Sequence, residues 1–186
     1  MVTQAVKAPK IVGLTSQSNA LFVNALGCYN QVLTYAEISQ LDPTIKTVFV
    51  DMAGNADIRR QIHEHFKDAL SYSCSVGGTH WDALSVPGQG SSIPGPKPTL
   101  FFAPAQIKKR SEQWGTKELQ TRMGKAWLAF LPQLDDWMHV VQHPGEAAVL
   151  KVYQEFLAGR SHADQGHVLS LRSAEQRCNS ETSPTT

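Results

Sequence analysis

Short apolar segments alternate with segments of helical periodicity over the first eighty residues. Residues 11–16 read IVGLTS, an apolar run bounded by polar residues, and this pattern is typical of a buried parallel strand. Further strands are predicted over residues 31–35, 47–52 and 70–76, the last ending at Gly77. This alternation predicts an α/β fold with a mostly parallel sheet.

The segments between these strands predict helices with definite ends. We expect Ser18 to cap the first helix and Gly27 to end it, and Asn55 to cap the helix after the third strand. In that later helix we expect Arg59 and His63 to lie mostly off the buried face. The apolar stripe of the same helix comprises Ile58, Ile62 and Phe66.

The second half of the chain begins with residues 84–98, which are rich in Pro, Gly and Ser and predict a loop. We expect Phe101, Phe102, Trp114 and Trp127 to pack in a core rather than line a ligand site. The remaining elements follow in chain order: a strand at 99–103, helices at about 106–114 and after Gly115, a strand at 138–143, an amphipathic helix at 146–159 and a strand at 166–171.

Composition narrows the class of protein. A formal net charge of +1 gives no electrostatic reason to expect nucleic acid or an anionic membrane as a partner. No apolar run approaches the ~18 residues of a membrane span, and the first residues do not read as a secretory signal. Cys28, Cys74 and Cys178 are widely spaced, which favours reduced thiols. We therefore expect a soluble, cytoplasmic protein.

Four segments, in their order and spacing, resemble a known superfamily: VGLTS, LGCYNQVLTYAEI, VFVDMAG and SYSCSVGGTHWDA. They are similar to the cofactor domain of the medium-chain dehydrogenase/reductase superfamily. More closely, the chain resembles an uncharacterised family related to that superfamily, and the resemblance covers about residues 10–172.

The resemblance implies a partial Rossmann-like, mostly parallel sheet with flanking helices, followed by a C-terminal helix and strand from a reductase-like second domain. The implied parts are an irregular N-terminus at 1–9, a Rossmann-like cofactor-domain portion at 10–137, a C-terminal segment at 138–172 and a disordered tail at 173–186.

In such a fold a dinucleotide lies across the carboxyl ends of the strands. Residues 15–19 hold hydroxyls and amides but no carboxylate, which favours NADP over NAD because these groups donate to a 2′-phosphate without repelling it. Asn19 and Met52 depart from residues that related reductases often carry. The implied cofactor-binding residues are Thr15, Ser16, Asn19, Tyr35, Met52, Gly54, Val76 and Gly77.

Each of these residues also has a purely structural interpretation, as a strand-to-helix turn, a core edge or a backbone turn. His80 is a weak candidate for a proton donor to a carbonyl substrate, and the alternative is a loop hydrogen bond. His63 and His65 lie two apart on a helix and point in different directions, so we expect no metal site there. Ser73 and Ser75 lack the surroundings of a hydrolase nucleophile.

No Gly-rich phosphate-binding turn lies before Ile11. The central strand of the superfamily's sheet is also missing, so the strands at 11–16 and 47–52 lose their shared neighbour. Three outcomes are open: the two strands pair directly, a second chain completes the sheet, or the chain is a truncated product of poor stability.

The function implied by the resemblance is a medium-chain-reductase-like oxidoreductase, or part of one, that uses NADP(H) on a small carbonyl or enoyl substrate. The alternative is a non-catalytic or cofactor-independent protein derived from the same fold, which binds a small molecule or a partner.

Overall fold

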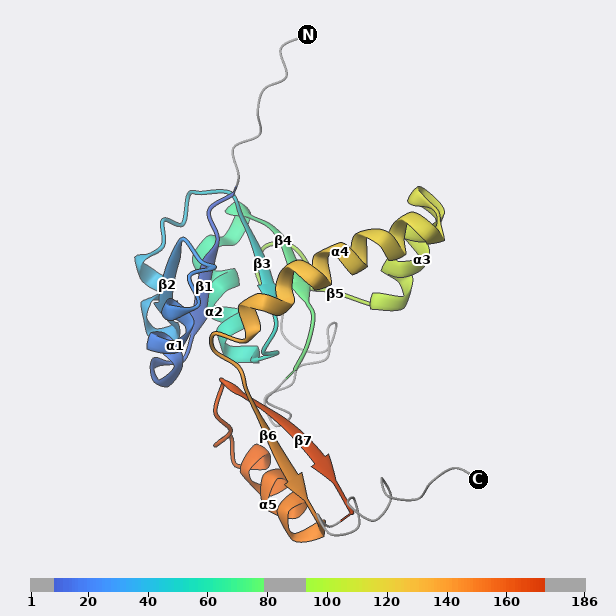
Figure 1. The fold of residues 1–186 in the computed structure, drawn as a ribbon. Helices are drawn as coiled ribbons and strands as arrows, with labels where there is room; N and C mark the ends of the chain where they lie inside the picture. The colour runs from blue at the N-terminus through green and yellow to red at the C-terminus, as the bar shows by residue number, and fades with distance from the viewer. Residues whose placement is uncertain (1–8, 79–92, 173–186) are drawn as a thin grey trace. The chain divides into compact units, whose positions relative to one another are not determined.

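A computed structural model describes residues 9–78 and 93–172 of the chain (Figure 1). The chain forms two compact units, residues 1–119 and 120–186, whose boundary lies within helix α4 (Thr116–Leu134). The described residues are about 48% helical, and their strands form parallel sheets flanked by helices. The predicted α/β class is therefore confirmed, and the arrangement is consistent with a Rossmann-like fold.

Unit 1 contains two parallel sheets. Strand β1 (Val12–Thr15) pairs with β2 (Gln31–Thr34), whereas β3 (Thr47–Asp51), β4 (Leu70–Ser75) and β5 (Thr99–Leu100) form a three-stranded sheet. In the part of the chain that the structure describes, β1 and β3 belong to different sheets. Direct pairing of these two strands, one of the three outcomes expected from the sequence, is therefore wrong.

Helices connect these strands and cover the core. They are η1 (Gln17–Asn19), α1 (Ala20–Ala25), η2 (Tyr35–Gln40), α2 (Ala56–Phe66) and η3 (Lys67–Ala69). Four buried residues form the centre of the core: Ile38, Ile62, Phe66 and Leu70. Leu14 of β1 and Phe49 of β3 both pack against this cluster, so the two sheets share one hydrophobic core.

The polar residues of α2 do not follow the sequence prediction. Ile62 and Phe66 are buried as expected, but Arg59 is only 5% exposed and His63 is fully buried. The prediction of both as residues mostly off the buried face is wrong. Each of them finds a hydrogen-bonding partner inside the protein, and such partners offset the cost of burying a polar group.

The ends of the helices match the prediction in two of three cases. The Asn55 side chain accepts hydrogen bonds from the backbone N–H groups of Asp57 and Ile58, at 2.9 and 3.2 Å. Gly27 follows α1 with a φ of 65°, a conformation that favours glycine. Ser18 does not cap α1, because η1 intervenes and the Ser18 hydroxyl lies 2.9 Å from the Ser16 hydroxyl instead.

Two further helices follow β5, namely α3 (Ala103–Trp114) and α4. Unit 2 continues as β6 (His139–Pro144), α5 (Glu146–Leu157) and β7 (Gln165–Ser170), with β6 and β7 parallel and in direct hydrogen-bonded register. These elements confirm the strand, helix and strand predicted for this part of the chain.

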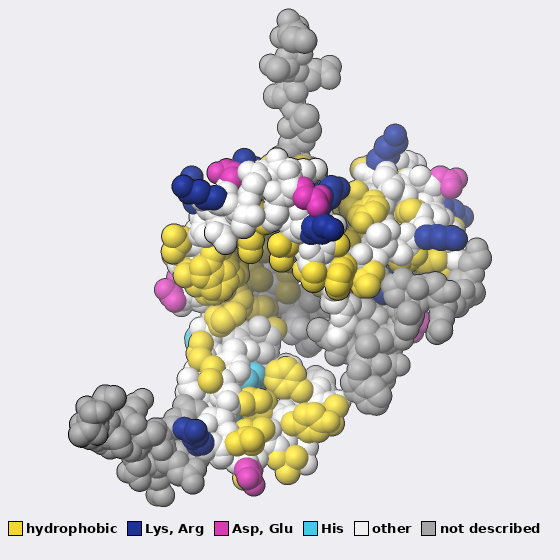
Figure 2. Space-filling view, turned by 90° about the vertical axis from the view of Figure 1, so that its right-hand side faces the viewer, with side chains coloured by type: hydrophobic (Ala, Val, Ile, Leu, Met, Phe, Trp, Pro, Cys, Tyr) yellow, Lys and Arg dark blue, Asp and Glu magenta, His cyan; other side chains and the backbone are white. Residues whose placement is uncertain are grey.

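Much apolar surface remains uncovered in the described residues, and Figure 2 shows hydrophobic side chains on the outside of the molecule. Phe102 and Trp127 are each 58% exposed, and Phe101 and Trp114 are 43% and 38% exposed. The predicted core of these four aromatic residues is therefore wrong. The reason is that α3 buries none of its residues and α4 buries only Leu119.

Across the described ranges, no helix has the length and apolar character that crossing a bilayer requires. Cys74 lies buried inside β4 and Cys28 is exposed.

Candidate functional site

The carboxyl ends of β3 and β4 are joined by their backbones. The Val76 N–H donates to the Asp51 carbonyl at 2.8 Å, and the Gly54 N–H donates to the Asp51 carboxylate at the same distance. A Cβ at Gly77 would lie only 2.9 Å from the Met52 carbonyl oxygen, so a side chain there would force these two strand ends apart. Four predicted site residues, those at positions 52, 54, 76 and 77, therefore meet at the edge of the sheet formed by the carboxyl ends of β3 and β4.

Tyr35 follows β2 at the start of η2, and its side chain packs against the buried core cluster. Burial, followed by the negative charge of the nearby Asp51 carboxylate, raises the pKa of the Tyr35 phenol above its usual value. The start of η2 is fixed by Glu37, whose carboxylate accepts hydrogen bonds from the backbone N–H and the hydroxyl of Thr34, both at 2.8 Å. Tyr35 thus lies just after β2 and packs against the core, in keeping with its structural interpretation as a core-edge residue.

The end of β1 carries the remaining predicted residues. Thr15 is 7% exposed and is in register with Thr34 of β2, so the ends of these two strands lie together. The Asn19 N–H donates to the Ser16 carbonyl at 3.1 Å and closes the turn that follows. Ser16 is half-buried, with its hydroxyl against that of Ser18. The turn therefore presents short hydroxyl and amide groups next to the end of β2.

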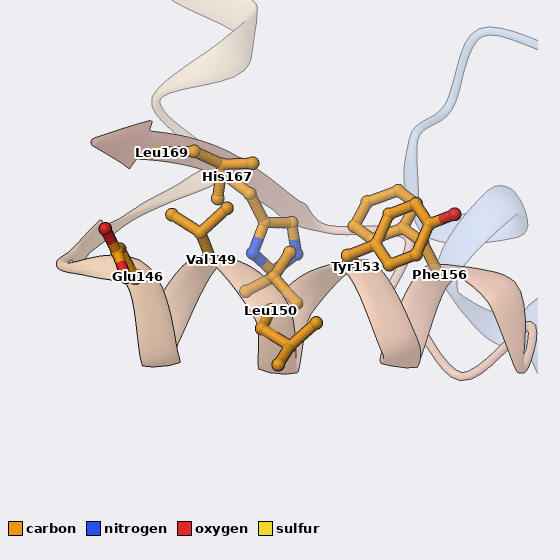
Figure 3. Close-up of a pocket in the computed structure, with 8 residues that line it drawn as sticks. Glu146, Val149, Leu150, Tyr153, Phe156, His167 and Leu169 are labelled. Atoms are coloured by element: carbon orange, nitrogen blue, oxygen red, sulfur yellow. The ribbon is translucent and has the colours of Figure 1, made fainter. Parts of the chain in front are cut away.

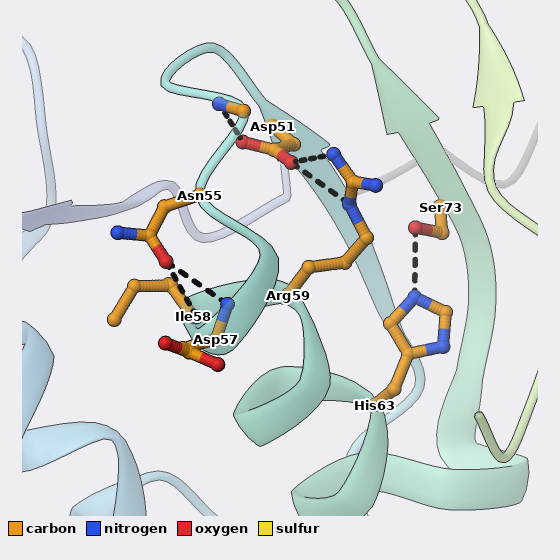
Figure 4. A network of polar contacts seen from close by, with 8 residues as sticks. Asp51, Asn55, Asp57, Ile58, Arg59, His63 and Ser73 are labelled. Carbon is orange, nitrogen blue, oxygen red and sulfur yellow. Dashed lines mark hydrogen bonds and ion pairs between the residues drawn. The ribbon is translucent and has the colours of Figure 1, made fainter. Parts of the chain in front are cut away.

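Sequence reasoning missed the ion pair between Asp51 and Arg59. One Asp51 carboxylate oxygen accepts from Nε and from a terminal nitrogen of Arg59, at 3.0 and 2.7 Å (Figure 4). Both side chains are only 6% exposed. The only signal in the sequence is an aspartate at the end of a strand followed by an arginine in the next helix. This pair neutralises the single carboxylate at the end of β3 and links β3 to α2.

A second buried polar group joins α2 to β4. His63 lies 2.9 Å from the Ser73 hydroxyl through Nε2 and 2.7 Å from the Pro94 carbonyl oxygen through Nδ1. Because a carbonyl only accepts, Nδ1 carries the proton and the Ser73 hydroxyl donates to Nε2. Ser73 is 1% exposed, so this pair is closed to a substrate and holds the turn at Pro94 in place.

Ser75, at the end of β4, was not expected to have a role. Its hydroxyl is buried and has no hydrogen-bond partner among the described residues. Ser75 is in register with Asp51 and therefore lies at the same edge as Met52 and Val76. A buried hydroxyl without a partner is unusual in a protein, and such groups often have a functional role.

Uncharged polar groups predominate at these strand ends. Residues 12–19 carry no charged side chain, and Asp51 is already paired with Arg59. Thr15 and Ser75 are 7% and 5% exposed, and the half-buried Ser16 carries the more accessible hydroxyl at these strand ends. His80, the candidate proton donor, lies outside the described residues, and those residues contain no cluster of three metal ligands.

Comparison with known proteins found no significant match among curated proteins or among solved structures. The relation to the medium-chain dehydrogenase/reductase superfamily therefore stays a prediction. One family model does match, and it covers residues 1–162. The chain belongs to the family described as Protein of unknown function (DUF2855).

Proposed function

We propose that this protein binds NADP(H) across the carboxyl ends of β1 to β4 and acts as a reductase-like oxidoreductase on a small carbonyl or enoyl compound. The observation that supports the proposal most is the meeting of Met52, Gly54, Val76 and Gly77 at the joined carboxyl ends of β3 and β4, where ligands bind in parallel α/β sheets. When bound, the cofactor would supply the hydride.

The residues of the chain would position the cofactor. The hydroxyls of Thr15 and Ser16 would donate to the 2′-phosphate, and the half-buried Tyr35 ring would lie against the adenosine end. The close approach of Gly77 to the Met52 carbonyl would keep the ends of β3 and β4 together beneath the ligand.

Cofactor binding is expected to raise the melting temperature of the purified chain. A ligand at about 100 times its dissociation constant adds roughly 2.7 kcal/mol to the free energy of unfolding, which corresponds to a rise of several degrees. The measurement is a thermal melt with excess NADPH, excess NADH or neither. We expect NADPH to produce the larger rise, and a sharp melt that neither nucleotide shifts would refute the proposal.

Ser16→Glu tests the part of the site that chooses between the two cofactors. A carboxylate there repels the 2′-phosphate and can accept from a free 2′-hydroxyl, so the NADPH shift should fall far more than the NADH shift. Ser71→Glu is the matched control, because it makes the same charge change at an exposed position near the amino end of β4. Equal losses from both variants would count against a 2′-phosphate site at Ser16.

A second candidate function rests on a different observation. Strands β1 and β3 lie in separate sheets, and three alternate residues on and after β3 are exposed: Val48 by 57%, Val50 by 49% and Met52 by 63%. Parallel sheets are normally covered on both faces and paired at their inner strands. This arrangement favours a second chain that completes the sheet.

Amide hydrogen exchange distinguishes this candidate. In the purified chain we expect amides along β1 and β3 to exchange faster than those of β4, which has a partner on both sides. Slow exchange along all three strands would mean that the strand edges are already covered, and the second candidate would then fail.

A further inference from the structure

Unit 2 contains an open groove between α5 and β7. The groove has a volume of about 560 Å³, within the usual range for small-molecule sites. Its walls are largely apolar and come from Val149, Leu150, Val152, Tyr153, Phe156 and Leu169. Val152 is 4% exposed, whereas Leu150, Tyr153 and Phe156 are each more than half exposed. The helix thus buries one residue of its apolar face and leaves the rest open.

The imidazole of His167 is a polar group within the apolar part of this groove. Figure 3 shows the imidazole of His167 extending from β7 toward α5, between Val149 and Tyr153. The ring of Phe156 meets it edge to face, with ring centres 5.3 Å apart. The position is fixed from behind by His143 of β6, whose Nε2 lies 2.8 Å from Nδ1 of His167.

The other nitrogen of His167 has no partner. Its Nε2 is buried and makes no hydrogen bond with any described residue. Leaving a buried polar group unsatisfied typically costs about 1–3 kcal/mol, so such groups in native proteins usually have a ligand, a water molecule or a catalytic role. Apolar side chains surround Nε2 of His167. A bound molecule should therefore place one polar atom beside this nitrogen and be apolar where it contacts those side chains.

The histidine pair can offer either a donor or an acceptor to that molecule. If Nδ1 of His167 donates to His143, Nε2 of His167 is an acceptor; if His143 donates instead, Nε2 of His167 carries a proton and donates. The position of the proton between His143 and His167 therefore determines whether Nε2 of His167 donates or accepts a hydrogen bond in the groove. A carbonyl oxygen selects one form, and a hydroxyl group can use either.

We propose that this groove binds a neutral, apolar small molecule through a single carbonyl or hydroxyl oxygen that hydrogen-bonds to Nε2 of His167. A neutral ligand is favoured because the Glu146 carboxylate also lines the groove and repels an anion. The proposal uses only residues of unit 2 and does not depend on cofactor binding in unit 1.

A second apolar hollow, on α4, has no counterpart of His167. It has a volume of about 590 Å³ and is lined by Met123, Gly124, Ala126, Trp127 and Phe130. No hydrogen-bonding side chain other than the Trp127 indole lines it, and its walls come from one helix. The hollow on α4 is an internal control for the groove between α5 and β7. A probe that binds by hydrophobic contact alone should bind the hollow and the groove equally well.

The test uses three aromatic probes of similar shape: 2-naphthol, 2-acetylnaphthalene and naphthalene. Titration of the full chain, labelled with ¹⁵N at histidine, is followed by NMR so that affinity and the His167 nitrogen signals are read together. We expect both oxygen-containing probes to bind about tenfold more tightly than naphthalene. We expect 2-acetylnaphthalene, which only accepts, to shift His167 to the form protonated at Nε2.

Two variants and a charged probe complete the test. His167→Phe should remove the preference for the oxygen-containing probes, whereas His139→Gln, an exposed histidine on β6, should keep it. The anion 2-naphthoate should bind more weakly than 2-naphthol. Equal affinity for 2-naphthol and naphthalene, binding that leaves the His167 nitrogen signals unchanged, or no binding up to the solubility limit would each overturn the proposal. The nitrogen signals of the unaltered chain decide the matter even if His167→Phe does not fold.

Discussion

Replacing Arg59 with methionine is expected to lower the free energy of unfolding by about 3–5 kcal/mol, the usual cost of removing one partner from a buried ion pair. Asp51 is 5% exposed and would lose the two hydrogen bonds at 3.0 and 2.7 Å that Arg59 provides. The remaining bond from the Gly54 N–H, at 2.8 Å, cannot replace a cation. Urea denaturation followed by circular dichroism measures the change.

The neighbouring residue offers a matched control. Arg60 lies 3.4 Å from Asp57, and the two side chains are 51% and 77% exposed. Exposed pairs contribute about 0–1 kcal/mol, so Arg60→Met should change stability little. The double variant Asp51→Asn with Arg59→Met should recover part of the loss, because it removes the uncompensated charge. Equal effects of Arg59→Met and Arg60→Met would show that the buried pair does not hold β3 to α2.

The strands and the helix ends show what the sequence can predict. Residues 48–50 form a continuous apolar run at the centre of a predicted strand, and this property belongs to the segment itself whatever packs against it. Asn55 is similar, since a cap needs only the first turn of its own helix. The prediction that Ser18 caps α1 was wrong because the short 3-10 helix η1 precedes α1. The hydropathy pattern does not distinguish a 3-10 turn from the start of an α-helix.

The buried polar residues show why the rest could not be predicted. Arg59 and His63 are polar by type, and only the position of Asp51 and of Ser73 in space makes their burial favourable. The same limit applies to His143 and His167, which are 24 residues apart and meet because β6 and β7 are parallel neighbours. Conversely, Trp127 looked like a core residue because its type is apolar, yet it remains 58% exposed.

The predicted site residues illustrate both sides of this limit. Met52, Gly54, Val76 and Gly77 came together because the ends of parallel strands meet at one edge, which follows from topology alone. The Ser75 hydroxyl at the same edge was passed over, because its sequence neighbours give no sign that it is buried without a partner.

Replacing His63 with leucine is expected to cost about 2–4 kcal/mol, since a buried hydrogen-bonding group is lost and its partner is left unsatisfied. The two side chains have similar volumes, so little of this cost comes from a cavity. Ser73, at 1% exposure, has no route to water and would carry most of the penalty. The Pro94 carbonyl would be released, and Gly95, whose φ of 80° fits only a glycine-like turn, would lose its tie to α2. Chemical denaturation and amide exchange at Gly95 measure the two effects.

A double-variant cycle separates this hydrogen bond from simple loss of packing. If the Ser73 hydroxyl is left unsatisfied by His63→Leu, then Ser73→Ala in the same chain should relieve part of the penalty, and the two changes together should cost less than their sum. Glu64→Ala, at the exposed neighbouring position on α2, should change stability by less than about 0.5 kcal/mol. Strict additivity of His63→Leu and Ser73→Ala would mean that the two residues do not share a hydrogen bond. In that case the penalty of His63→Leu would come from the hydrogen bond between Nδ1 and the Pro94 carbonyl, at 2.7 Å, and from packing.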